Sequence, residues 1–272
     1  MQAVEEVFGF LSPHEYRRRF HNQVPVVMRG AMLPLVPGLA LWGDAGYVIG
    51  GLTHAHGGDA QTVTVMHATD HRRFMDNDIM VTKSQMRIGD VLAKIGDVQQ
   101  PRVYLRHAIL PGIHGDALAP VIAAVQQMID GPGATPLNAS LCRLWIGSAG
   151  NCTPLHYDRC HGVLGQLTGT KRFVLVDPED TSNVYPHSST SPAAHGSRVD
   201  VAAWANEATV ADARTRFPKF ERAVRYFVDL QPGDCLITPA GWWHDVTSTS
   251  PSISVTVPFN LFANDAVPAH FL

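Results

Sequence analysis

The C-terminal half of the chain contains short runs in which apolar and polar residues alternate, as expected for strands with one buried face. Turns rich in Gly and Pro separate these runs, as at Pro232-Gly233-Asp234. The predicted strands lie at residues 140–146, 163–167, 171–176, 226–230, 235–238 and 253–257. The pair 163–167 and 171–176 is predicted to form a hairpin around Thr168-Gly169-Thr170. Many short strands joined by such turns favour a mainly β fold, a double-stranded β-helix or jelly roll.

The N-terminal half mixes helical and strand patterns. Ser12 would cap a helix that carries Glu15 three residues later and runs to about His21. The run at 24–30 is typical of an edge strand, because Pro25 cannot donate a hydrogen bond to a neighbouring strand. Further strands are predicted at 47–51, 61–66 and 102–106, and further helices at 84–95 and 117–129. We therefore expect N-terminal helices and additional strands beside the jelly roll.

The length of the chain suits a single domain. Its 272 residues can bury one large core without a second fold. Residues from about 1 to 135 would form an α/β extension that packs on the barrel, and residues from about 136 to 262 would form the jelly-roll core. The long irregular stretch at 177–225 is predicted to be an insert that covers the substrate side of the site, with helical character near 202–214.

Composition excludes several classes of protein. A net charge of −3 gives no basic surface for nucleic acid, and no apolar stretch approaches the length that spans a membrane. Cys142, Cys152, Cys160 and Cys235 form no C-x-x-C pair, and the start of the chain has no basic region followed by an apolar run. We expect a cytoplasmic protein with reduced thiols.

Candidate chemistry gathers at Thr153-Pro154-Leu155-His156-Tyr157-Asp158. Residues two apart in a strand share a face, so His156 and Asp158 could bind one ion, and His244 could supply a third ligand from a later strand. Two imidazoles and one carboxylate on one face of an ion are the ligand set of non-haem Fe(II) oxygenases. The alternative is a surface histidine, a turn aspartate and a core histidine. Asp245, beside His244, is expected to be solvated rather than a partner of that histidine.

A second metal site is conceivable at His54-Ala55-His56, where two histidines have the same spacing. This pair lies in a Gly-rich stretch without a nearby acidic or cysteine ligand, so a solvated loop is favoured there.

Lys171 is a candidate for anion binding. It shares a strand face with Phe173 and Leu175, and an ammonium group on a buried apolar face is unfavourable unless an anion joins it. An exposed strand lysine is the alternative, because apolar residues occur on both faces of this strand.

An ordered series of motifs resembles the cupin-like JmjC oxygenases, and especially hydroxylases of the type of the asparaginyl hydroxylase that inhibits hypoxia-inducible factor. The motifs, besides the stretch 153–158, are Leu144-Trp145-Ile146-Gly147, Gln166 to Phe173, Ser197-Arg198-Val199-Asp200, Phe217-Pro218-Lys219-Phe220, and Leu230 to Asp234 continuing to Trp242-Trp243-His244. The resemblance extends from about Pro25 to Val257, and the order of the motifs is far more specific than H-x-D alone.

The resemblance implies an Fe(II)- and 2-oxoglutarate-dependent dioxygenase that consumes O2. By that likeness the iron ligands and catalytic centre would be His156, Asp158 and His244, and the cosubstrate would meet Lys171, Thr153 and Tyr104. Two positions depart from the asparaginyl hydroxylase pattern. Gly162 and Pro258 stand where that enzyme has asparagines near the cosubstrate.

The implied activity is hydroxylation of an unactivated C–H bond, in an amino-acid side chain of a protein or peptide. A tailoring hydroxylase of a small metabolite or peptide natural product is an alternative, and so is a non-catalytic cupin-like binding module. The sequence leaves open the substrate, whether demethylation replaces stable hydroxylation, and the oligomeric state.

Overall fold

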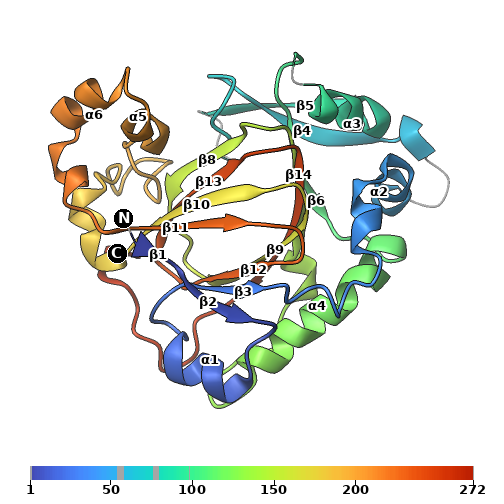
Figure 1. Cartoon of the computed structure of the whole chain (residues 1–272), viewed down its shortest axis with the longest axis horizontal. Coiled ribbons are helices and arrows are strands. Elements are labelled where there is room, and N and C mark those ends of the chain that lie inside the picture. The colour runs from blue at the N-terminus through green and yellow to red at the C-terminus, as the bar shows by residue number, and fades with distance from the viewer. Residues whose placement is uncertain (1, 54–57, 76–79, 98, 272) are drawn as a thin grey trace.

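Two β-sheets form the centre of the protein in the computed structural model, which describes residues 2–53, 58–75, 80–97 and 99–271 (Figure 1). The predicted mainly β, cupin-like jelly-roll fold is confirmed. In the order of pairing, the larger sheet contains β2 Glu5–Phe8, β3 Val26–Arg29, β12 Cys235–Thr238, β9 His161–Thr168, β14 Ser252–Phe259, β7 Arg143–Gly147, β6 Tyr104–Ala108, β4 Thr62–Ala68 and β5 Val81–Arg87. The smaller sheet contains β1 Gln2–Ala3, β11 Arg225–Leu230, β10 Lys171–Val176, β13 Trp243–Ser248 and β8 Cys152–His156.

The predicted hairpin between β9 and β10 is wrong. Both strands exist, but β9 pairs with β12 and β14 in the larger sheet, whereas β10 pairs with β11 and β13 in the smaller one. Gly169 makes the turn with a φ of 67°, and the chain crosses from one sheet to the other there. This crossing places the start of β10, and with it Lys171, between the sheets.

The strand near Pro25 is not at an edge. β3 begins at Val26, directly after the proline, and pairs with β12 on one side and in parallel with β2 on the other. The proline lies just outside the strand, so it removes no hydrogen bond from the ladder. The sequence analysis did not find β2, which is rich in charge and largely exposed.

The described helices are α1 Pro13–Arg19, α2 Ala45–Leu52, α3 Ile88–Gly96, α4 Ile113–Ile129, α5 Val201–Ala205 and α6 Val210–Arg216. The Ser12 cap is confirmed, since its side chain accepts a hydrogen bond from the Glu15 amide, although the helix ends at Arg19. The strand predicted at 47–51 is wrong, because α2 occupies that stretch after an Asp44 cap that accepts from the Tyr47 amide. The helix predicted at 84–95 begins only at Ile88, after β5.

Helices α1 to α4 cover the outer face of the larger sheet (Figure 1). A large apolar cluster joins them to the outward side chains of that sheet, among them Leu144, Val163 and Val255. A smaller cluster that includes Val27, Phe173 and Leu236 fills part of the space between the two sheets. The remaining space between the sheets holds a cavity.

The predicted insert at 177–225 is irregular apart from α5, α6 and short 3-10 turns, and it lies beside the open end of the smaller sheet (Figure 1). His54-Ala55-His56 lies outside the described residues. Among the helices that the structure describes, none is both long enough and apolar enough to cross a membrane.

Candidate metal and cosubstrate site

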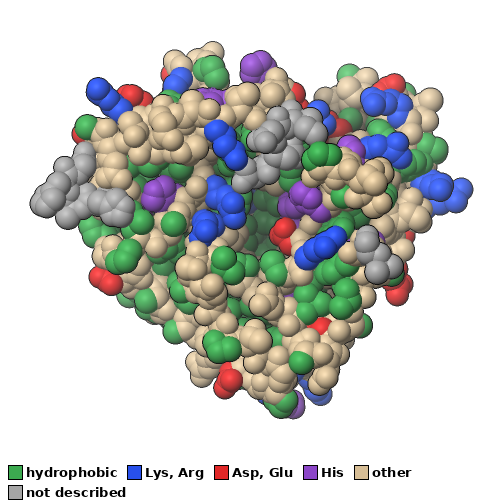
Figure 2. Space-filling model, turned by 180° about the vertical axis from the view of Figure 1, so that it is seen from behind, with side chains coloured by type: hydrophobic (Ala, Val, Ile, Leu, Met, Phe, Trp, Pro, Cys, Tyr) green, Lys and Arg blue, Asp and Glu red, His purple; other side chains and the backbone are tan. Residues whose placement is uncertain are grey.

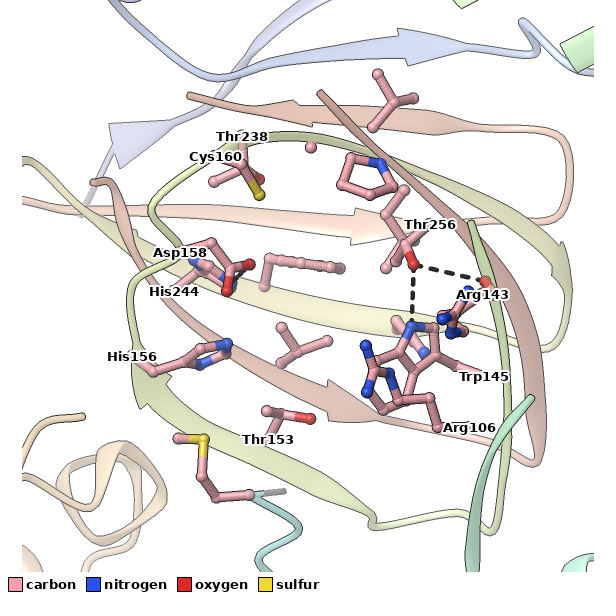
Figure 3. A pocket seen from close by; sticks show the side chains of 18 of the residues that line it. Arg106, Arg143, Trp145, Thr153, His156, Asp158, Cys160, Thr238, His244 and Thr256 are labelled. Carbon is pink, nitrogen blue, oxygen red and sulfur yellow. Dashed lines mark hydrogen bonds and ion pairs between the residues drawn. The ribbon is translucent and has the colours of Figure 1, made fainter. Parts of the chain in front are cut away.

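Three predicted metal ligands meet at the end of the smaller sheet. β8 and β13 pair antiparallel with His156 directly opposite His244, and their imidazole centroids are 4.2 Å apart. Asp158 follows two residues after the end of β8, so it lies past the strand rather than within it as the strand periodicity suggested. One ligand atom from each of the three side chains lies within 4.8 Å of the others (Figure 3).

Main-chain carbonyl groups fix which ring nitrogen faces the cluster. His156 Nδ1 lies 2.8 Å from the Pro154 oxygen, and His244 Nδ1 lies 2.9 Å from the Trp242 oxygen. A carbonyl oxygen can only accept, so each Nδ1 must carry a proton and donate it. Each Nε2 of a neutral ring is then left with a lone pair for a metal.

The electrostatics of the cluster keep these groups in the protonation states that a metal requires. Burial, together with repulsion from His244, lowers the pKa of His156 to about 4. The loss of hydration caused by the surrounding protein would by itself favour the neutral acid at Asp158, although the side chain keeps much of its exposure. The neighbouring charges of His156, His244, His195 and Arg106 nevertheless hold the pKa of that carboxyl below its usual value. At neutral pH the cluster therefore offers a neutral His156 ring and a carboxylate.

This donor set fits Fe(II). Two imidazole nitrogens and one carboxylate oxygen converge from one side, and the other side opens into the cavity, where the Asp158 side chain is 60% exposed. A metal held in this way would keep open positions toward the cavity, as the two-histidine, one-carboxylate arrangement does.

Lys171 lies at the base of the same cavity and is only 1% exposed. Its Nζ donates to Ser254 Oγ at 2.7 Å and to the Tyr104 hydroxyl at 3.3 Å. Burial lowers the pKa of this lysine to about 7. The described partners of Lys171 are hydroxyl groups and include no carboxylate, so a bound anion would favour its charged form. The prediction that Lys171 faces inward is confirmed by its burial.

Tyr104 and Thr153 lie near Lys171. The family resemblance implied that these three residues contact one ligand, so their proximity is consistent with it. Both line the cavity, and Tyr104 is buried. Burial raises the pKa of Tyr104, although a hydrogen bond with the Thr153 side chain opposes that effect. The two hydroxyl groups and the Lys171 ammonium thus form a polar base of the cavity, and this base suits a carboxylate.

The two departures from the asparaginyl hydroxylase pattern prove to be neighbours. Gly162 on β9 and Pro258 on β14 are register partners, and both line the cavity, whose volume is about 350 Å³. A Cβ atom added to Gly162 would meet nothing within 4 Å. The cavity therefore has open space beside Gly162.

A family model described as "Cupin-like domain" matches residues 13–264. The chain belongs to the cupin-like domain family.

The JmjC relationship is supported by several curated proteins, whose matches cover a third or less of their own length. Jumonji C domain-containing protein 5 of Drosophila melanogaster is 38% identical over 149 residues, which are 55% of this chain and 33% of that protein. HSPB1-associated protein 1 of Homo sapiens is 39% identical over 126 residues, 45% of this chain and 23% of that protein. Lysine-specific demethylase 8 of Danio rerio is 38% identical over 112 residues, 41% of this chain and 25% of that protein.

Members of the JmjC family are typically Fe(II)- and 2-oxoglutarate-dependent oxygenases, and they include demethylases and hydroxylases. The family expectation therefore agrees with the donor set and with the buried lysine. It does not by itself identify a substrate for this cupin-like chain.

Several residues at the site were not found from the sequence. Ser254 was missed as a partner of Lys171, although a serine between Ile253 and Val255 in an apolar strand is a signal of a buried hydroxyl. Arg106 and Arg143 also line the cavity. They are far apart in the sequence, and the pairing of β6 with β7 brings them together.

The insert contributes His195 to the site of this cupin-like protein. The Tyr157 amide donates to the His195 oxygen at 3.0 Å, and the Ser197 amide donates to the Leu155 oxygen at 2.8 Å. These bonds attach the insert to the end of β8 like one more strand. They place the His195 ring at the cavity, with its centroid 6.3 Å from that of His156. The prediction of the insert as a cover on the substrate side agrees with this position.

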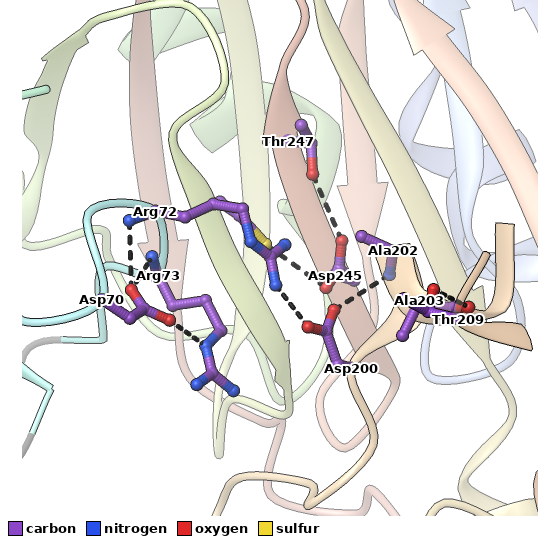
Figure 4. A network of polar contacts seen from close by, with 10 residues as sticks. Asp70, Arg72, Arg73, Asp200, Ala202, Ala203, Thr209, Asp245 and Thr247 are labelled. Carbon is purple, nitrogen blue, oxygen red and sulfur yellow. Dashed lines mark hydrogen bonds and ion pairs between the residues drawn. The ribbon is translucent and has the colours of Figure 1, made fainter. Parts of the chain in front are cut away.

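The sequence predicted a solvated Asp245, and this prediction is wrong because the side chain is buried. It alternates with His244 along β13, so it faces away from the metal ligands. The Cys152 thiol donates to its carboxylate at 3.5 Å, and burial raises the pKa of Asp245 to about 7. Nearby, Arg72 forms an ion pair with Asp200 of the insert (Figure 4). The four cysteines are free, as predicted.

A second histidine and aspartate cluster lies on the far side of β9. Asp265 accepts from His21 at 2.6 Å and from His161 at 3.3 Å. His161 Nδ1 in turn accepts the Ala240 amide at 3.0 Å, so its Nε2 carries the proton. These groups satisfy one another, and they join the N-terminal helix region to the segment after β14.

Proposed function

We propose that this chain is an Fe(II)- and 2-oxoglutarate-dependent dioxygenase that hydroxylates an unactivated C–H bond in an amino-acid side chain of a protein or peptide. The observation that carries the proposal is the meeting of His156, Asp158 and His244 with the buried Lys171 in one cavity. A metal site without an anion site would be compatible with many functions. A buried lysine without a metal site would not indicate an oxygenase. Together they fit a metal and a dicarboxylate that act side by side.

Each group has a role that follows from its position. His156, Asp158 and His244 would hold the iron, and Lys171, Thr153 and Tyr104 would hold the far carboxylate of 2-oxoglutarate. O2 would supply the oxidising power, and the bound iron would make its reaction possible: one oxygen atom would enter the C–H bond as a hydroxyl group, and the other would enter succinate as 2-oxoglutarate loses CO2. The chain itself supplies position, charge and a lining that includes the apolar side chains of Phe74, Phe173 and Val246. No general base is required.

An anaerobic optical titration tests this function. Fe(II) and then 2-oxoglutarate are added to the metal-free protein, and we expect the weak visible charge-transfer band of a chelated keto acid. His156→Ala should lose the band because the metal is no longer held. Lys171→Ala should weaken 2-oxoglutarate binding by at least about thirtyfold, the effect of removing one partner of a buried charge pair.

Two exposed residues of the same types provide matched controls, His14→Ala and Lys219→Ala. Both should give the wild-type titration. Iron binding without a band would contradict the assigned cosubstrate, and a failure of the wild-type protein to bind iron would favour the non-catalytic binding module.

A further inference from the structure

One wall of the cavity carries two arginines. Arg106 on β6 and Arg143 on β7 line the cavity together with Trp145 and Thr256, opposite the metal ligands (Figure 3). The register explains their common face. Trp145 pairs with Arg106, and Arg143 pairs with Ala108, so residues two apart on these strands point the same way. The molecular surface is hollowed here, with Lys or Arg side chains beside the hollow (Figure 2).

The wall is fixed before any ligand arrives. The Arg106 guanidinium lies 5.5 Å from the centre of the Trp145 ring, a cation–π distance. Trp145 Nε1 donates to Thr256 Oγ1 at 3.1 Å. Arg143 Nη1 donates to the carbonyl oxygens of Ser140 and Cys142. Both guanidinium groups are therefore positioned by neighbours on the wall itself.

The balance of charge points to an anion at this wall. Asp158 is the only acidic residue among the described residues that line the cavity, and it belongs to the metal site. Lys171 and the metal would be balanced by Asp158 and by the two carboxylates of 2-oxoglutarate. No described carboxylate then remains in the lining for Arg143, whose described contacts are neutral carbonyl groups.

Resting on the proposed function, we propose that Arg143, with Arg106 beside it, binds a carboxylate group of the substrate. The C–H bond to be oxidised would then lie between this wall and the metal ligands. Arginine suits this role because its planar fork of donors matches the two oxygens of a carboxylate. The substrate class is an acidic side chain in a peptide or a small free acid of similar shape.

Matched acid and amide probes test the assignment. Blocked pentapeptides that differ only by Asp against Asn, or Glu against Gln, are compared with N-acetylglutamate and N-acetylglutamine. Binding is measured anaerobically from the shift of the visible band, and succinate formation is measured in air. We expect the acid member of at least one pair to bind at least about tenfold more tightly than its amide. A preference among the peptides would indicate an acidic side chain as the substrate, and a preference for N-acetylglutamate would indicate a small free acid.

Variants of the wall show which arginine produces the preference for acids over amides. Arg143→Gln should remove most of it, Arg143→Lys should retain part, and Arg106→Gln gives a second, independent removal of charge. Arg172→Gln is the control, because that exposed arginine pairs with Asp229 outside the cavity. In Arg143→Gln, Arg143→Lys and Arg172→Gln the affinity for 2-oxoglutarate should stay within about twofold of the wild type.

Equal binding of acids and amides by the wild type overturns the proposal. So does a large loss of 2-oxoglutarate affinity in Arg143→Gln, which would assign the wall to the cosubstrate. If the wild type gives no band with Fe(II) and 2-oxoglutarate, it is the proposed oxygenase function that fails, and the wall loses its assigned substrate with it.

Discussion

Lys171 is a buried amino group whose charged form is unfavourable for the fold and, under the proposed function, would bind a ligand. Its pKa falls from 10.5 to about 7 because burial disfavours the charge. The unfolded chain therefore binds more protons than the folded chain between these values, and the stability of the free protein should rise with pH there. Below about pH 7 the folded state must carry the buried charge, and the full unfavourable contribution is present.

Replacing this lysine by an apolar residue of similar length should therefore stabilise the free protein. We expect Lys171→Met to raise the free energy of unfolding by about 1–4 kcal/mol at pH 6.5, as for other buried charges replaced by apolar groups. The same variant should lose 2-oxoglutarate binding. Urea denaturation with and without 2-oxoglutarate measures both effects, and Lys219→Met is the exposed control. A destabilised variant that still binds the cosubstrate would remove Lys171 from its assigned role.

Gly162 and Gly165 lie on the same strand but in opposite environments. A Cβ at Gly162 would enter open space in the cavity, whereas a Cβ at Gly165 would lie 2.5 Å from Met32 Sδ. Gly162→Ala should leave the stability unchanged or raise it by up to about 1 kcal/mol, because alanine restricts the unfolded chain. Gly165→Ala should lower it by about 1–3 kcal/mol through overpacking. Thermal unfolding of the two variants compares them, and equal losses would mean that the cavity does not extend to Gly162.

The sequence was a better guide to the site residues than to their surroundings. His156, Asp158 and His244 were predicted together because their types and motif order are specific, and the structure brings them together. Arg143 could not be found in this way. Arginine is a common surface residue, and only the pairing of β7 with β6 shows that it shares a face with Arg106.

At the scale of elements, patterns predicted strands well and their partners poorly. β9 and β10 alternate as a hairpin would, and the glycine between them suits a turn. Pairing depends on contacts far away in the sequence, however, and β10 instead fits between β11 and β13. The short α2 was mistaken for a strand because its apolar residues are too few to distinguish the two periods.

The insert packs on the smaller sheet through a buried apolar cluster that includes Val184, Val199 and Phe220, and an ion pair joins it to the segment that follows β4. Arg72 forms an ion pair with Asp200, whose carboxylate also caps α5 by accepting the Ala202 amide (Figure 4). Asp200→Ala should change the melting temperature little, because half-exposed ion pairs contribute about 1 kcal/mol or less. It should, however, speed proteolytic cleavage within 177–225 several-fold, because opening of the insert alone is governed by local stability.

Limited trypsin digestion followed by mass spectrometry measures that rate. Asp212→Ala is a suitable control, because its 72% exposed side chain pairs with Arg216 within α6 itself. Unchanged cleavage in Asp200→Ala would show that the backbone bonds to β8 hold the insert without this ion pair.

At the scale of the whole molecule, the sequence predicted the layers but not the contacts that join distant parts of the chain. Turn residues and strand lengths indicated a jelly roll with N-terminal helices, and two sheets with helices on one face are observed. The cluster of His21, His161 and Asp265 could not be foreseen. Its members come from three distant parts of the chain, and none lies in a motif.

Asp265 should be a main determinant of how the two ends of the chain stay attached to the barrel. Its carboxylate accepts from His21, His161 and the Phe262 amide, and it is only 8% exposed. Asp265→Asn should lower the free energy of unfolding by about 2–4 kcal/mol, since charge-assisted bonds contribute about 1.5–3 kcal/mol each and one acceptor oxygen remains. Asp229→Asn, which affects an exposed ion pair with Arg172, should lower it by less than about 1 kcal/mol.

The pH dependence of this difference identifies its origin. Hydrogen bonds from the Phe262 amide and His21 outweigh burial and lower the pKa of Asp265, so its contribution is present above the unfolded pKa and is lost as pH falls through the folded one. Burial lowers the pKa of His161 from 6.5 to about 4, so the unfolded chain takes up that proton first and the wild type also loses stability over this range. Denaturation at several pH values should therefore show a difference between wild type and Asp265→Asn that is large at pH 7 and closes below about pH 4. A difference that persists in acid would instead assign the loss to altered packing around residue 265, and the two ends would then be joined by shape rather than by charge.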